Sequence, residues 1–426
     1  MRQLRNLLVV LLCLGCGNVP DINRISSVSL SDPSFSATMA AHLDAPVMPG
    51  NRVDILLNGE EIFPAMLEAI RGARKSITYA QYLYKGGTIA RELARAFAER
   101  CRAGVQVKLL IDSHGGGNMP VDIPELWKQA GCDLRWFRRI KLFQFITPWE
   151  LLDYNYRNHR RILVIDGKIG FTGGNGVSDA WTGDGRTKGH WRDTDVEVEG
   201  PAVRQLQGAF VESWRETTGN VLGGETYFPA LAPAGGSDAQ VVKSSPMSGS
   251  FDAYLFYLMS IAAAKKSIYI TNPYFLPGDR LTEALLAAAS RGVRVVLLTP
   301  GVIDWQVVYR ASRSGFGPLL LGGIKIYEYQ PALMHAKTMV IDGMLATVGS
   351  TNLDNRSFAL NEEIDLVVRD AGIARQLETS FAEDLKHSTE VTYEAWKSRS
   401  LSEKILELFT YDRGRAMTAR LFEQSF

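Results

Sequence analysis

The sequence predicts an α/β protein made of two consecutive copies of one domain. At 426 residues it is longer than one ordinary hydrophobic core supports. A pattern reading His-x-(Lys/Arg)-x4-Asp-Gly occurs twice, at 159–167 and at 335–343. In both halves, strand-like apolar runs alternate with helix-like ones, which is typical of the α/β class. A repeat of this length indicates duplication of a domain, not a solenoid.

The first fifty residues are expected to target and tether the protein. Residues 1–16 place two arginines before an apolar stretch of about ten residues, too short to cross a bilayer. Gly15-Cys16 resembles the cleavage site of bacterial lipoproteins, and a short uncleaved anchor is the alternative. Residues 17–50 are rich in Ser, Pro, Ala and Asn without periodicity, which predicts a flexible tether. Both alternatives place the protein at a bacterial cell membrane.

The first domain is expected over residues 51–230. It opens with a strand at 53–57, followed by a helix at 60–73 whose apolar side chains recur at helical spacing. Those side chains are Ile62, Met66, Leu67 and Ile70.

The second domain is expected over residues 236–426. A stretch rich in Pro, Ala, Gly and Ser around 229–250 marks the boundary. Beyond it the segments 73–79 and 102–110 are echoed by 264–270 and 290–298. Each domain therefore reads as helix, strand, helix and strand, followed by the segment with the repeated pattern.

Each copy of the pattern predicts a β-hairpin. The β-branched run before Asp-Gly indicates a buried strand, and Asp-Gly favours a two-residue type I′ turn. In the second copy this turn pairs residue i with 685 minus i, which places His335 opposite Ser350. Alternation then puts Lys337 and Asn352 on the same face. An imidazole, an ammonium, a hydroxyl and an amide are expected to converge there.

A histidine and a fixed cation on one strand face suit phosphodiester chemistry. The cation holds phosphoryl oxygens while the imidazole attacks phosphorus or transfers a proton. In the first copy, His159 and Arg161 share a face by the same alternation. One copy alone would read as an ordinary edge strand, but two copies in matching contexts favour a site. For Asp166 and Asp342, a plain turn role is a strong alternative.

On these residues the sequence resembles the phospholipase D superfamily and, within it, the bacterial cardiolipin synthases. The resemblance rests on NHRRILVIDGKIGFTGG and HAKTMVIDGMLATVGSTNLDNRSFALNEE, supported by NGEEIFPAMLEAIRGARKSI, NPYFLP and GIKIYEYQPALMHAK. It covers roughly residues 52–390. It implies two phospholipase D-like domains, each a mixed β-sheet flanked by helices. They would be related by pseudo-twofold symmetry, with both repeated segments in one active site.

The resemblance also implies a phosphatidyltransferase that joins two phosphatidylglycerol molecules into cardiolipin and glycerol through a phosphohistidine. In this superfamily the amino-terminal copy usually carries the nucleophile, so that role falls to His159 and the acid and base role to His335. The remaining predicted site residues hold phosphoryl oxygens or orient the histidines: Arg161, Lys337, Ser350 and Asn352 for the former, Asp166 and Asp342 for the latter. No metal or other cofactor is expected, because the six histidines and four cysteines show no metal-ligand spacing.

Phospholipids and a membrane surface are the expected partners. Phosphatidylglycerol is the first candidate donor and phosphatidylethanolamine the second. With a net charge of +1 the chain lacks the basic excess usual in a nucleic-acid channel, so nucleic acid is not expected. A phospholipase D-type hydrolase is the closest alternative. A non-catalytic lipid-binding scaffold is a further one, because Arg161 and Gly176 replace the family's usual lysine and asparagine.

Three other features leave alternatives open. Residues 135–149 interleave cations with aromatic side chains, as a lipid-entrance border or an aromatic-cored strand would. Four carboxylates follow the repeated segments at similar distances and either support the histidines or sit at solvated strand ends: Asp193, Asp195, Glu362 and Glu363. Cys101 and Cys132 pair if the domain is exported, or remain buried free thiols.

Overall fold

The computed structural model describes residues 19–139 and 154–400, apart from positions 23, 27 and 305, together with 403–404. The expected targeting segment 1–16, and most of the aromatic and basic stretch 135–149, lie outside the described residues. Within the described ranges, no helix combines the length and apolarity needed to cross a bilayer.

The strands of the two halves follow one another in the chain. Those of the first half are β1 (Met48–Leu57), β2 (Ser76–Gln81), β3 (Gln106–Asp112), β4 (Asp133–Phe137), β5 (Ile162–Ile165), β6 (Ile169–Gly173) and β7 (Thr194–Glu199). Those of the second half are β8 (Ser237–Ser244), β9 (Ser267–Thr271), β10 (Arg294–Pro300), β11 (Lys325–Tyr329), β12 (Thr338–Ile341), β13 (Leu345–Gly349), β14 (Glu363–Arg369) and β15 (Ser388–Val391).

Helices connect these strands in both halves. The first half contains α2 (Phe35–His42), α3 (Asn58–Gly72), α4 (Thr88–Arg102), α5 (Asp122–Gln129), the 3-10 helix η1 (Asp179–Trp181) and α7 (Val203–Thr218). The second contains η2 (Pro246–Ser248), α8 (Asp252–Ala263), α9 (Asp279–Ser290), α10 (Gln306–Ser314), α11 (Phe316–Leu321), α12 (Asn355–Ala359), α13 (Ala371–Lys386) and α14 (Tyr393–Lys397).

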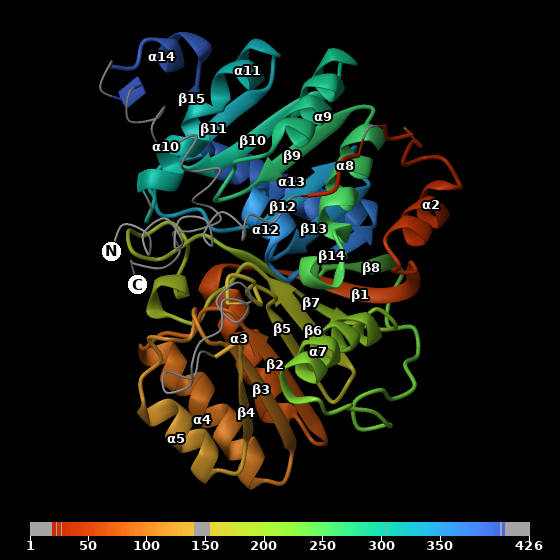
Figure 1. The fold of residues 1–426 in the computed structure, drawn as a ribbon, viewed down its shortest axis with the longest axis vertical. Helices are drawn as coiled ribbons and strands as arrows, with labels where there is room; N and C mark the ends of the chain where they lie inside the picture. Colours follow the sequence, from red (N-terminus) through yellow and green to blue (C-terminus); the bar gives the residue numbers. More distant parts are fainter. Residues whose placement is uncertain are drawn as a thin grey trace, which may run out of the picture.

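The described strands form one mixed sheet whose order is nearly a palindrome (Figure 1). The order is β15-β11-β10-β9-β12-β13-β14-β8-β1-β7-β6-β5-β2-β3-β4. Strands β8 and β1 meet at the centre, and equivalent strands follow outward on both sides. The pairs β2–β3, β3–β4, β9–β10 and β10–β11 are parallel and the others antiparallel. The predicted class, an α/β protein with a mixed sheet in each of two similar halves, is confirmed.

Helices cover both faces of the sheet, so central strands are apolar on both sides. In β5, Leu163 and Ile165 join the core beneath α3, α4 and α5. Ile162 and Val164 point to the opposite face, against α7. That second core continues across the centre of the sheet to α13, so the two halves share it. The predicted strand at 53–57 and helix at 60–73 correspond to β1 and α3.

Both predicted hairpins are present, but their register differs from the prediction by one residue. Asp342 and Gly343 have φ of +55° and +65°, as a type I′ turn requires. Pairing resumes only after one further residue, so Ile341 lies opposite Leu345. The ladder follows 686 minus i instead of 685 minus i. The first hairpin repeats this arrangement, with Ile165 opposite Ile169.

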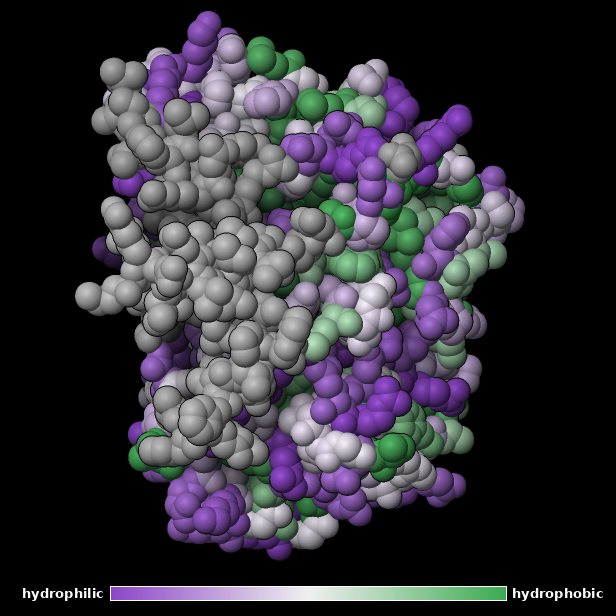
Figure 2. All heavy atoms as spheres, in the orientation of Figure 1, coloured by the Kyte–Doolittle hydropathy of each residue, from purple (hydrophilic) through white to green (hydrophobic). Residues whose placement is uncertain are grey.

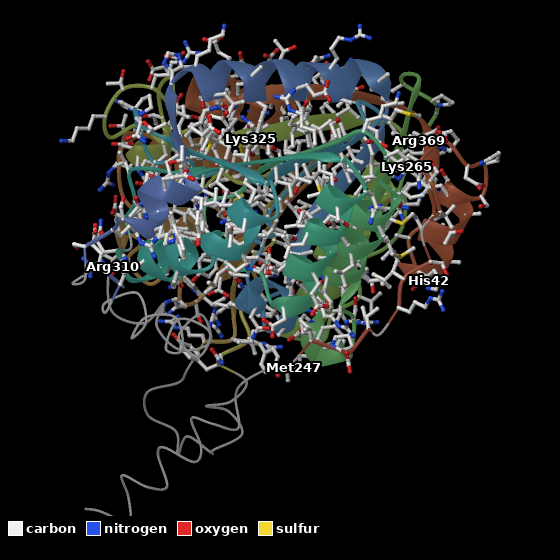
Figure 3. The ribbon with its side chains drawn as sticks, turned by 90° about the horizontal axis from the view of Figure 1, so that it is seen from above. His42, Met247, Lys265, Arg310, Lys325 and Arg369 are labelled. Atoms are coloured by element: carbon white, nitrogen blue, oxygen red, sulfur yellow. A yellow bond between two sulfur atoms is a disulfide. The ribbon has the colours of Figure 1, made fainter. Side chains whose placement is uncertain are left out.

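The expected tether is wrong for residues 30–46, which are folded against the second half. Phe35 and Met39 of α2, with Leu43 beyond it, are buried beside α8. Arg369 of β14 donates to Ser36 Oγ at 3.0 Å and to the Leu30 carbonyl at 3.1 Å, and Figure 3 shows Arg369 beside this segment. These apolar side chains are four residues apart, as on one face of a helix. The helix is so short that this pattern does not stand out in the sequence.

Cys101 and Cys132 form a disulfide. The bond ties the last turn of α4 to the residue before β4, at the outer edge of the first half. Of the two readings left open by the sequence, pairing is the one found.

Candidate active site

The two repeated segments meet because each is held by the other half of the chain. The His159 N–H donates to the Glu362 carbonyl at 2.9 Å, and the His335 N–H donates to the Arg192 carbonyl at 2.7 Å. Isolated bridges join Asn158 to Glu362 and Arg192 to Met334. The entry to each histidine strand therefore lies against the carboxylate-bearing strand of the opposite half.

His159 is held by a carboxylate of the second half. Its Nδ1 lies 2.9 Å from both carboxylate oxygens of Glu363, the first residue of β14. The other ring nitrogen, Nε2, lies 3.1 Å from Arg161 Nη2. The imidazole is 7% exposed, and the ring of Tyr82 packs edge-on at 4.9 Å.

His335 repeats the arrangement with a carboxylate of the first half. Its Nδ1 lies 2.8 Å from Asp193 Oδ2, one residue before β7, and Lys337 Nζ lies 2.8 Å from Nδ1 and 3.1 Å from Nε2. The ring is 5% exposed and packs edge-on against Trp181 at 5.1 Å. Asp193 and Glu363 are therefore exchanged between the halves, each orienting the histidine of the other.

Burial and neighbouring cations lower the pKa of both imidazoles. Burial, Arg161 and Lys337 hold the pKa of His159 well below its ordinary value. Burial and Lys337 lower the pKa of His335 to about 3, although Asp193 opposes them. Because these groups act on one another across the halves, both pairs occupy one electrostatic site. A neutral imidazole with Nδ1 on a carboxylate leaves Nε2 with a lone pair for attack or proton transfer.

The predicted cations lie beside the histidines. Arg161 also donates from Nη1 to the His159 carbonyl at 2.8 Å and from Nε to the Asn175 carbonyl at 3.1 Å. Burial lowers the pKa of Lys337 to about 7. Asn352 is buried, and its side-chain oxygen has no hydrogen-bond partner among the described residues. A role for these groups in holding phosphoryl oxygens stays a prediction.

The expectation that Ser350 lies opposite His335 is wrong. Its hydroxyl donates to Glu363 Oε2 at 2.5 Å and accepts from the Ile364 N–H at 2.9 Å. The register shift of one residue in the hairpin accounts for this position, which is on the His159 side of the site. Ser350 thus supports the carboxylate that orients His159.

The expectation that Asp166 and Asp342 orient the histidines is also wrong. Asp166 accepts the backbone N–H groups of Arg74, Lys75 and Ser76, between α3 and β2. Asp342 accepts those of the equivalent residues between α8 and β9, which are Lys265, Lys266 and Ser267. Both aspartates fasten a hairpin turn to the loop before the neighbouring strand.

Gly176, which replaces the family's asparagine, makes room for Trp181. A Cβ on Gly176 would lie 2.9 Å from the Trp181 ring. The indole Nε1 donates to Asp193 Oδ2 at 2.8 Å. In the first half Gly174 stands at the position of Ser350 and carries no hydroxyl. Trp181 thus gives Asp193 the hydrogen-bond donor that Ser350 gives Glu363. The carboxylate from the first half therefore keeps a side-chain donor although Gly174 and Gly176 provide none.

Sequence reasoning named Asp193 and Glu363 without choosing their role, and it missed Trp181. Their similar distance after each repeated segment was the available signal for the carboxylates. No sequence pattern pointed to Trp181, because its contact depends on the space left by Gly176. Asp195 and Asp365, two residues further along each strand, are buried against the backbone of Asn175 and Thr351.

The sequence matches the protein family described as "Cardiolipin synthase, PLD-like domain" over residues 66–212 and 257–385. It is 35% identical over 372 residues to cardiolipin synthase 1 of Bacillus anthracis, covering 85% of this chain and 72% of that protein. It is 36% identical over 371 residues to a probable cardiolipin synthase of Bacillus subtilis (strain 168), covering 87% of this chain and 73% of the relative.

Solved structures share the fold at much lower identity. The phosphatidylserine synthase of Haemophilus influenzae Rd KW20 aligns with a TM-score of 0.65 and 13% identity, covering 92% of this chain and 100% of that one. The polyphosphate kinase of Porphyromonas gingivalis aligns with a TM-score of 0.53 and 11% identity, covering 94% of this chain and 58% of that one. At these identities the similarity concerns the fold alone.

Proposed function

Because the chain belongs to the phospholipase D superfamily, as a cardiolipin synthase-like phosphatidyltransferase, we propose that it joins two phosphatidylglycerol molecules into cardiolipin and releases glycerol. The observation that carries the proposal is the exchange of carboxylates between the halves. Each histidine of the repeated pattern is oriented through Nδ1 by the opposite half, so two Nε2 atoms with complementary tasks serve one site.

The reaction would proceed in two displacements. His159 Nε2 attacks the phosphorus of one phosphatidylglycerol, forming an N–P bond as the bond to the glycerol headgroup breaks. His335, which enters this step protonated on Nε2 with its charge stabilised by Asp193, gives that proton to the departing glycerol alkoxide. It then removes a proton from the free hydroxyl of a second phosphatidylglycerol, whose oxygen attacks the phosphohistidine and releases His159.

The cations would stabilise the charge that builds up on the phosphoryl oxygens in both steps. Arg161 Nη2 lies 3.1 Å from Nε2 of His159, and Lys337 Nζ lies against the His335 ring, 3.1 Å from its Nε2, so each imidazole has a cation at its side. Asp193 and Glu363 hold the rings and stabilise the imidazolium while it carries a proton. Arg161 is a guanidinium where the family usually has lysine, and its planar fork suits phosphate oxygens.

The reaction implies contact with a lipid surface. We propose that the protein is held at the bacterial cell membrane through residues 1–16, with Cys16 as the lipid-modified residue. Phosphatidylethanolamine is proposed as the second candidate donor, in place of one phosphatidylglycerol. Burial of both histidines within the protein supports transfer to an alcohol over hydrolysis, because water must be kept from the phosphohistidine.

Lipid mass spectrometry on the purified protein tests the proposal. Wild type, His159→Ala and His335→Ala are incubated with phosphatidylglycerol, alone and with phosphatidylethanolamine. We expect cardiolipin and an equal amount of glycerol from wild type, and a loss of at least about 10³-fold in each variant, because both residues act on the reacting atoms.

The products separate the alternatives. Phosphatidic acid without cardiolipin would make the protein a hydrolase of the phospholipase D type. No product from any lipid would favour the non-catalytic scaffold.

A further inference from the structure

A second group of buried cations lies beside His159, outside the two histidine–cation pairs. The chain enters the first repeated segment in extended form, paired through the bridge between Asn158 and Glu362. Alternation places Arg157, His159 and Arg161 on one side of this segment. Two residues of extended chain span about 7 Å, so a cation stands at that distance before and after the histidine.

Arg157 has donor capacity that the protein leaves unused. Its side chain is 2% exposed, and its guanidinium lies over the Tyr154 ring at 4.2 Å. Nη1 lies 3.2 Å from Ser113 Oγ and 3.4 Å from Asp112 Oδ1. Nη2 is buried and has no hydrogen-bond partner among the described residues. An unpaired buried donor costs free energy, so we expect this nitrogen to bind an acceptor atom of a ligand.

Arg356 of the second half completes the group. It lies in α12, is buried, and donates from Nη1 and Nη2 to Asn155 at 3.1 and 2.9 Å. Burial lowers the pKa of Arg356, and the positive charge of Arg157 lowers it further. Its charge also lowers the pKa of His159, whose ring Tyr82 contacts edge-on. Asn155, which Arg356 contacts, lies two residues before Arg157, and Arg157 lies two residues before His159, so both guanidinium groups belong to the region beside this histidine.

The duplicated chain lacks this group on the His335 side. At the offset that relates His159 to His335, Leu333 is the equivalent of Arg157. The turn after β6 places Ala180 at the equivalent of Arg356. Two cations therefore adjoin one histidine, whereas apolar residues and the Trp181 ring adjoin the other. This asymmetry is not needed for a phosphoryl group that both half-sites share.

We propose that Arg157 and Arg356 form a subsite for a second phosphodiester, one glycerol unit away from the phosphate that reacts at His159. The inference rests on the proposed function and specifies its acceptor. Two phosphatidyl groups joined through a glycerol have two phosphates, whereas water or a simple alcohol brings none. Guanidinium groups bind phosphate oxygens bidentately, and two of them fit one phosphodiester.

Acceptor selectivity tests the subsite. With phosphatidylglycerol as donor, transfer to isotope-labelled glycerophosphoglycerol is compared with transfer to isotope-labelled glycerol. The first acceptor carries the phosphate without acyl chains, so the phosphate contribution is separated from lipid packing. The ratio of the two kcat/KM values does not depend on how much enzyme is folded.

We expect Arg157→Gln and Arg356→Gln each to lower this ratio at least tenfold, and Arg356→Lys to lower it less. Arg313→Gln is the matched control, because Arg313 is a partly buried arginine ion-paired with Glu328 in another part of the second half. It should leave the ratio unchanged. A ratio that stays constant in both glutamine variants while transfer continues would overturn the subsite. Wild type that forms only phosphatidic acid would instead overturn the proposed function.

Discussion

At the scale of single residues, the site is symmetric in its histidines and asymmetric in what supports them. Glu363 accepts a hydrogen bond from the Ser350 hydroxyl, whereas the shorter Asp193 accepts one from the indole N–H of Trp181. Gly174 and Gly176 make the second arrangement possible by leaving space for Asp193 and for the Trp181 ring. The donor to Asp193 is therefore a tryptophan where the donor to Glu363 is a serine. This difference requires glycine at both 174 and 176.

This exchange predicts that Trp181→Phe impairs the enzyme through Asp193. Phenylalanine keeps the ring against His335 but removes a hydrogen bond to a buried carboxylate, worth about 1.5–3 kcal/mol. We expect kcat for cardiolipin formation to fall roughly 10- to 100-fold with little change in KM. Steady-state kinetics by lipid mass spectrometry measures both.

Trp191→Phe is the matched control. The Trp191 ring centroid lies 5.5 Å from that of His335, but the hydrogen bond to Asp193 comes from Trp181. Its kcat should remain within about threefold of wild type. Equal losses in both variants would show that the rings act by packing, without a specific donor to Asp193.

The two histidine–cation pairs were predictable from the sequence, whereas the side chains that support them were not. Two copies of one pattern identify His159, Arg161, His335 and Lys337, because strand alternation is enough to bring a histidine and a cation to one face. The partners Asp193 and Glu363 depend on contacts between halves that are far apart in sequence. Trp181 depends on an empty space beside Gly176, which spacing does not reveal.

At the scale of elements, the Asp-Gly turns are anchors of the sheet. Asp166 and Asp342 have φ of +53° and +55°, and each caps the backbone N–H groups that begin the neighbouring strand, β2 or β9. The prediction of a hairpin was right because Asp-Gly fits a type I′ turn. Its register was not, because one further residue separates the turn from the first ladder pair, in which Ile341 lies opposite Leu345.

Removing the cap should therefore cost stability and spare the chemistry. Asp166→Ala loses the carboxylate and places alanine in a left-handed conformation, together about 2–3 kcal/mol. The free energy of unfolding from urea titration should fall by that amount, while kcat per folded molecule stays within about twofold. Asp166→Asn, which tolerates the same φ, should lose less.

A loss of activity without a loss of stability would support the role in orienting the histidines that the structure argues against. A large fall in kcat for Asp166→Asn, with no change in unfolding, would mean that this carboxylate acts on the histidines after all.

At the scale of the whole molecule, duplication explains both the architecture and its limits. The sheet order is palindromic because two copies of one domain meet at β1 and β8, and the site lies where each copy lends a carboxylate to the other. The face shown in Figure 2 mixes hydrophilic and hydrophobic residues over the described part of both halves. Composition and repeats predict such a duplication, but they do not reveal that residues 30–46 fold back onto the second half.

The disulfide bears on the compartment in which the protein works. Cys101 and Cys132 close a loop with a sequence separation of 31. Such a bond stabilises by roughly 3–4 kcal/mol in the chain-entropy model and persists only in an oxidising environment. The proposal that residues 1–16 direct the protein to the membrane therefore predicts that the bond is formed in the cell.

Thiol labelling measures this directly. Cells producing the protein are quenched in acid, and thiols are alkylated before and after reduction and counted by mass. We expect two additional labelled thiols after reduction in wild type and none in the Cys101→Ser, Cys132→Ser double variant, which should unfold at lower urea. Full labelling of wild type before reduction would contradict export. The two cysteines are close enough to form the bond, so free thiols in the cell would mean that the surroundings are reducing.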